Sequence, residues 1–71
     1  MELREVFARN LRYYRRKKGL SQEALAHEAD IDRTYVSALE RANYAASIDM
    51  IGKLAQVLDI DPMLLLQRER C

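Results

Sequence analysis

The most constraining feature of this sequence is a pair of short helical patterns with only three residues between them. Residues 22–29 and 33–41 each carry apolar side chains at helical spacing, and residues 30–32 are too few for anything but a tight turn. Ser21 and Asp32 each stand immediately before one of these segments, where a side-chain oxygen can cap the first turn of a helix. The sequence therefore predicts two short helices that cross at a steep angle.

Small and branched apolar residues fit the contact that such a crossing needs. Ala26 and Ala29 are small enough for the two helices to approach closely, and Ile31 fills the turn. Val36 and Leu39 can anchor the second helix from beneath. The opposite face of the second helix then stays polar and exposed, and it can enter a DNA major groove about 12 Å wide.

Capping and terminating residues mark three further helices. An apolar stripe that starts at Leu3 ends at Gly19, a residue that commonly follows the last turn of a helix. Ser47 precedes a second stripe that starts at Ile48, and Asp61 opens a short last segment. No segment alternates apolar and polar residues as a strand does. The predicted all-α domain, over residues 1–71, has five helices at about 3–18, 22–29, 33–41, 48–58 and 62–68.

The composition excludes several kinds of function. His27 and Cys71 are the whole supply of soft metal ligands, so we expect no metal and no cofactor. No nucleophile with an adjacent base and no paired carboxylates are recognisable, and we expect neither an enzyme nor a small-molecule substrate. No apolar run approaches the roughly 18 residues of a membrane span, and the first five residues lack a secretion signal. We therefore expect a cytoplasmic protein with no membrane partner.

The basic residues are unevenly distributed although the net charge is only +1. Residues 1–18 hold seven of the twelve lysines and arginines and only two acidic residues. A run of this kind is commonly a solvated helix face, and we assign Arg9 and Arg16 to such a face.

The last predicted helix is more apolar than one domain can use. A chain of 71 residues is close to the lower limit for independent folding, and such small domains are commonly stabilised by disulfides, a metal or association of two copies. Because a single cysteine excludes an internal disulfide and no metal is expected, association of two copies remains. Residues 63–66 are four consecutive large apolar side chains, of which one helix face can bury only part. We therefore expect a twofold dimer interface built from Ile60, Met63, Leu64, Leu66 and Tyr44.

Two runs carry a resemblance to a known family. They are Leu-Ser-Gln-Glu-Ala-Leu-Ala at residues 20–26 and Ile-Asp-Arg-Thr-Tyr-Val-Ser-Ala-Leu-Glu-Arg at residues 31–41. Together they resemble the Xre-type, lambda-repressor-like DNA-binding domain, and the resemblance covers about residues 5–66. Residues 32–41 look most like the small controller proteins of restriction–modification systems. The resemblance implies a five-helix domain with its helix-turn-helix at the second and third helices. It also implies a homodimeric transcription regulator that reads a palindromic operator in double-stranded DNA.

The resemblance also implies roles for individual residues. The expected base contacts are made by Arg33, Thr34 and Ser37. The expected phosphate contacts are made by Gln22, Tyr35, Arg41, Asn43 and Arg12. Arg15 and Glu40 are expected to form an ion pair between the first and third helices. The sequence departs from the family pattern at Asp30 and Ala42, where glycine is usual, and at Ala46, where proline is usual.

Two other functions stay open at this point. The chain could be the antitoxin of a toxin–antitoxin pair, although 71 residues leave little room for a toxin-binding extension. It could also be a protein-interaction module on the same scaffold. A protein-interaction module would be expected to have an acidic or apolar outer face on the third helix, and Arg33 and Thr34 argue against this.

Overall fold

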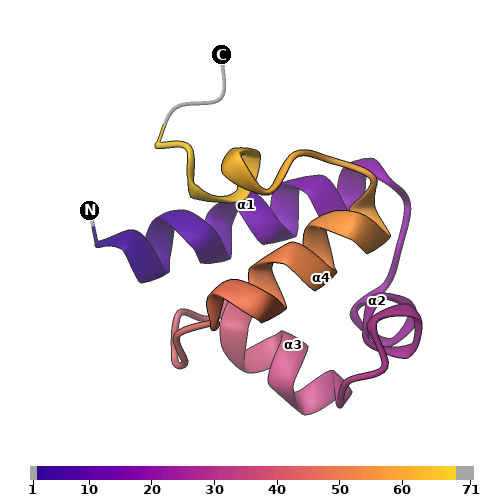
Figure 1. The fold of residues 1–71 in the computed structure, drawn as a ribbon. Helices are drawn as coiled ribbons and strands as arrows, with labels where there is room; N and C mark the ends of the chain where they lie inside the picture. The colour runs from indigo at the N-terminus through magenta and orange to yellow at the C-terminus, as the bar shows by residue number, and fades with distance from the viewer. Residues whose placement is uncertain (1, 69–71) are drawn as a thin grey trace.

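The structure is a computed structural model that describes residues 2–68, and in these residues it contains helices and no strand (Figure 1). Its four α-helices are α1 (Leu3–Lys17), α2 (Gln22–Ala29), α3 (Arg33–Glu40) and α4 (Ile48–Leu58), followed by the short 3₁₀ helix η1 (Pro62–Leu66). The predicted all-α fold is confirmed, and the predicted bounds of α2 and α4 agree with the structure. Within residues 2–68, no helix is both long and apolar enough to cross a membrane.

The prediction of a fifth α-helix over residues 62–68 is wrong. The last segment is a 3₁₀ helix of five residues, in which the backbone N–H of Leu64 donates to the carbonyl of Asp61, three residues earlier. The buried side chain of Asn10 donates to the carbonyls of Leu65 and Gln67, at 3.0 and 2.7 Å. Because α1 takes up these carbonyls, the chain turns to an extended conformation at Gln67 instead of continuing as a helix.

Side-chain caps fix where the later helices begin. Ser21, Asp32, Ser47 and Asp61 each accept a hydrogen bond from a backbone N–H two or three residues further on, at 2.7–3.0 Å. These four residues were predicted as caps from the sequence, and the prediction is confirmed. Each cap satisfies one of the N–H groups that the first turn of a helix leaves without a partner.

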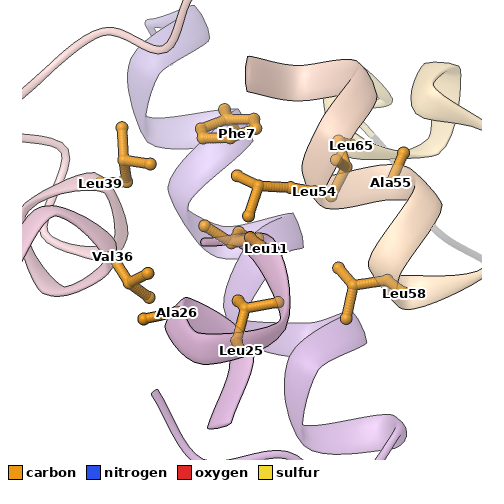
Figure 2. Close-up of a cluster of buried hydrophobic side chains, with 11 residues drawn as sticks. Phe7, Leu11, Leu25, Ala26, Val36, Leu39, Leu54, Ala55, Leu58 and Leu65 are labelled. Carbon is orange, nitrogen blue, oxygen red and sulfur yellow. The ribbon is translucent and has the colours of Figure 1, made fainter. Parts of the chain in front are cut away.

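The core is a cluster of apolar side chains to which every helix contributes (Figure 2). It comprises Phe7, Leu11, Leu25, Ala26, Ala29, Val36, Leu39, Leu54, Ala55, Leu58 and Leu65. The side chains of Val36 and Leu39 are completely buried in it. The inner face of α3 is therefore fixed to the domain, as the sequence predicts.

Within residues 2–68, three residues other than glycine adopt the left-handed backbone conformation at turns. Asp30 has φ 57°, Ala42 has φ 60° and Asp59 has φ 58°. Asp30 ends α2 in this conformation and so permits the tight turn to α3, at a position where glycine is usual in the family that the sequence resembles. Ala42 has no polar side chain to stabilise the same geometry, and a β-carbon in this conformation costs about 1–2 kcal/mol.

Candidate nucleic-acid interface

The first turn of α3 presents its polar side chains to solvent. Arg33 and Thr34 are exposed, whereas Val36 on the opposite side of the helix is completely buried. Ser37 is half-buried, and its hydroxyl accepts a hydrogen bond from Nη1 of Arg41 at 3.0 Å. The free outer face of α3 therefore begins with a cation and a hydroxyl, followed by the linked pair of Ser37 and Arg41.

The carboxylate of Asp32 organises the start of this face. It accepts a hydrogen bond from the backbone N–H of Thr34 at 2.7 Å. This bond, the hydroxyl of Thr34 and the nearby charge of Arg33 hold the pKa of Asp32 below its ordinary value. Asp32 is therefore negatively charged under ordinary conditions and fixes the neighbouring Thr34.

A buried ion pair connects α1 to the end of α3. Nε of Arg15 lies 2.6 Å from Oε2 of Glu40, and Nη2 of Arg15 donates to Oε1 at 3.0 Å. Glu40 is only 2% exposed, and its carboxylate also accepts a hydrogen bond from Nε2 of Gln22 at 2.9 Å. The third donor of Arg15 binds the carbonyl of Leu20 at 2.9 Å. This network joins α1, the start of α2 and the end of α3, and it takes up an amide N–H of Gln22, for which the sequence suggested a phosphate contact.

Arg12 lies at the same end of α3. Its Nη1 donates to the backbone carbonyl of Glu40, so the guanidinium caps the carboxyl end of the helix. Arginine has five N–H donors, so this contact leaves most of them available to another acceptor. Arg12 is half-buried, which places it beside α3 and at the surface of the domain.

Two tyrosines stand next to the outer face of α3. Tyr35 is half-buried and packs against the core, and its ring centroid lies 6.3 Å from that of Tyr44. Tyr44 is 58% exposed, and Asn43 beside it is also exposed. Tyr35 and Asn43, which were expected to contact phosphates of the DNA, thus lie on α3 and on the loop directly after it.

The residues expected in a dimer interface are distributed over several places. Leu66 lines an apolar groove, Ile60 lines a different hollow together with Tyr14 and Leu58, and Tyr44 pairs with Tyr35. Ile60 and Leu66 are half-buried against the core, and Leu64 is also half-buried. Met63 is 66% exposed.

The apolar groove contains two exposed large apolar residues, Leu3 and Ile48, that were not expected in a dimer interface from the sequence. The groove has a volume of about 610 Å³ and is lined by Glu2, Leu3, Arg4, Phe7, Ala46, Ile48, Ile51 and Leu66. Leu3 is 52% exposed and Ile48 is 86% exposed, although both begin an apolar stripe of their helices. Each stands at the first position of its helix, beyond the reach of the core. Helical spacing alone does not predict the exposure of these two residues. The spacing shows which face of a helix is apolar, but it does not show how far along that face the core extends.

No group of three or more histidine, cysteine, aspartate or glutamate residues within residues 2–68 could hold a metal ion. His27 is exposed on α2, and Cys71 lies outside the described residues.

Comparison with known proteins places this arrangement among transcription regulators. A sequence model described as helix-turn-helix matches residues 11–65. A hypothetical transcription factor from Neisseria meningitidis serogroup B is 46% identical over 59 residues, which cover 83% of this chain and 56% of that protein. The chain thus spans little more than half of the Neisseria relative.

Two solved structures resemble the fold over most of its length. The restriction–modification controller protein C.AhdI from Aeromonas hydrophila is 45% identical, with a TM-score of 0.84 over 87% of this chain and 94% of that one. The biofilm master regulator SinR, in a complex with DNA, is 32% identical, with a TM-score of 0.82 over 86% of this chain and 98% of that one.

Proposed function

Since this chain belongs to the Xre-type helix-turn-helix family of DNA-binding transcription regulators, we propose that it reads a specific double-stranded DNA site with the outer face of α3. The observation that carries the proposal is the two-sided character of α3. Val36 and Leu39 are completely buried, whereas Arg33 and Thr34 are exposed at the amino end of the same helix. Helix-turn-helix proteins contact base edges with the amino-terminal residues of the second helix.

The proposed base contacts follow from the donors on this face. The guanidinium of Arg33 can donate two hydrogen bonds to O6 and N7 of a guanine in the major groove. Thr34 can contact a thymine methyl group or donate to a base, and Ser37 stands one turn further along α3. Because Arg41 already donates to Ser37, we propose that Ser37 contributes less to base discrimination than Arg33 does.

The proposed phosphate contacts surround this face. Arg41 and Asn43 are exposed at the end of α3, and Tyr35 lies at its edge. Gln22 is fixed by Glu40 at the start of α2, and Arg12 is fixed by the carbonyl of Glu40. These groups position the protein on the duplex without reading its sequence.

We propose that two copies associate through the apolar groove and bind a palindromic operator. Leu3 and Ile48 expose large apolar side chains at the rim of a groove that Phe7 and Leu66 also line. Side chains three residues apart lie on the same side of a 3₁₀ helix, so the exposed Met63 stands above Leu66 and extends this surface. A second copy of the chain supplies the matching apolar surface. Two recognition helices can then enter successive major grooves about 34 Å apart.

The proposed function is tested by selection from genomic DNA. The purified protein is incubated with genomic fragments, bound fragments are sequenced, and the enriched site is footprinted. We expect a symmetric protected site and loss of enrichment when Arg33 is replaced by alanine. Retention of random fragments only, with no recurring sequence, would refute sequence-specific binding.

A further inference from the structure

A second basic surface lies on α1. It is a shallow hollow of about 500 Å³. Its lining residues are Arg9, Arg12, Tyr13, Arg16 and Lys17. Four of these five residues are cations and none is acidic, so the hollow is a concentrated positive surface in a chain whose net charge is only +1.

The hollow has a defined wall. The ring of Tyr13 packs edge-on against that of Tyr14, with centroids 4.9 Å apart, and Nζ of Lys17 lies 5.7 Å from the centroid of Tyr13. Arg9 donates to the backbone carbonyl of Arg68, which holds it at the other end of the hollow. Arg16 also lines the hollow and is exposed.

Arg12 connects this hollow to α3. The same guanidinium that lines the hollow donates to the carbonyl of Glu40, at the last residue of α3. Arg41 follows directly on the other side of that carbonyl and is exposed. Arg12 therefore belongs both to the hollow on α1 and to the end of α3.

We propose that the hollow on α1 binds backbone phosphates of the duplex outside the stretch of bases that α3 reads. The inference rests on the proposed function, because it needs a duplex docked on α3. A duplex in that position continues past the end of the recognition helix, where Arg12 and Arg16 present their donors. Phosphodiesters are the ligand class, since they carry the negative charge and the acceptor oxygens that these guanidinium groups require. Residues that looked like a solvated helix face in the sequence thereby extend the footprint on DNA.

Salt dependence provides the test. The affinity of the full chain for a mixed-sequence duplex is measured by fluorescence anisotropy between about 50 and 200 mM salt. The Arg16→Ala variant is compared with Lys53→Ala, which removes one cation from an exposed residue of α4 that does not line the hollow. Thermal melting of both variants checks that the fold is unchanged.

We expect Arg16→Ala to make the negative slope of log affinity against log salt shallower by about 0.9 for each bound protomer, the value for one lost phosphate contact. Addition of Lys17→Ala makes the slope shallower still, and discrimination between the selected site and mixed-sequence DNA is retained. An unchanged slope, or an equal change in Lys53→Ala, overturns the inference and leaves the role of α3 intact. Failure of the proposed function gives a different result, because wild-type protein and Arg33→Ala then bind all DNA sequences with equal affinity.

Discussion

Arg15 binds both carboxylate oxygens of Glu40 inside the domain, with Nε to Oε2 at 2.6 Å and Nη2 to Oε1 at 3.0 Å. The pair fixes the end of α3 to the last turn of α1. Gln22 donates to the same carboxylate, so the start of α2 is positioned by the same group. The relative placement of α2 and α3 therefore depends on one buried charge pair.

Removal of one partner of this pair should strongly destabilise the fold. Glu40→Ala leaves the buried guanidinium of Arg15 without its counter-charge, and the expected loss in the free energy of unfolding is about 3–5 kcal/mol. Urea denaturation followed by circular dichroism measures it. The double variant Arg15→Met/Glu40→Leu serves as the control, because it leaves no buried charge unpaired and should recover much of the loss. A loss of less than 1 kcal/mol in Glu40→Ala would contradict this account.

Arg33→Ala should weaken specific binding and leave the fold intact. The expected cost is about 1–3 kcal/mol at the selected site, with one base position becoming permissive, because a bidentate contact to guanine is lost. Competition binding against single-base variants of the site measures this. Lys53→Ala removes an exposed cation elsewhere and should leave the base preference unchanged. Equal base preference in wild type and Arg33→Ala would show that Arg33 reads no base.

Ile48→Ser should separate the two copies of the proposed dimer. The side chain is 86% exposed, so its replacement leaves the core untouched while it removes apolar surface from the groove. Sedimentation equilibrium is expected to show a weaker association than in wild type. Tyr44→Ser is the matched comparison, because Tyr44 is 58% exposed and does not line the groove. If Tyr44→Ser dissociates the protein and Ile48→Ser does not, the interface lies elsewhere.

Ala42→Gly should stabilise the protein. Relief of the left-handed conformation at φ 60° is worth about 1–2 kcal/mol, and the greater freedom of glycine in the unfolded chain offsets about 0.4–1 kcal/mol of it. The expected net gain is roughly 0.5–1 kcal/mol, measured as a higher midpoint of urea denaturation. Ala45→Gly is the control, because Ala45 is exposed and has no positive φ. It relieves no strain, so the greater freedom of glycine in the unfolded chain should lower its stability. A midpoint for Ala42→Gly below that of wild type would refute the argument.

Asp32 should make stability sensitive to acid. Its pKa is lowered in the folded state by hydrogen bonds from Thr34, so its contribution is fully present above the ordinary pKa of 3.8 and is lost as the pH falls through the lower folded-state value. Melting temperatures measured from about pH 5 to pH 2 should therefore fall less in Asp32→Asn than in wild type, because asparagine still caps the helix without titrating. Parallel curves for the two proteins would assign the acid sensitivity to other groups.

The sequence was most informative where the physical cause is local. Ser21, Asp32 and Ser47 act on a backbone N–H only two or three residues away, and the helices that they start were placed correctly. The burial of Val36 and Leu39 follows from helical spacing in the same local sense. These features sufficed to predict the exposed face of α3.

The errors and omissions concern interactions between distant parts of the chain. The type of η1 depends on Asn10, which is 55 residues away from Leu65, and the position of Arg12 depends on a carbonyl 28 residues away. Ile48 keeps helical spacing with the core and still lies outside it, because burial at a helix end depends on what the rest of the fold places there. No local pattern encodes such partners.

The dependence of η1 on the amide of Asn10 has a consequence for the dynamics of the chain. A single side chain binds the carbonyls of Leu65 and Gln67, and η1 itself is too short to persist alone, so this segment should be the first to open in native-state hydrogen exchange. Leu66 belongs to the same segment and lines the groove at which we propose that two copies meet. Closure of the segment and pairing of the copies should then be thermodynamically linked, with exchange protection that rises with protein concentration.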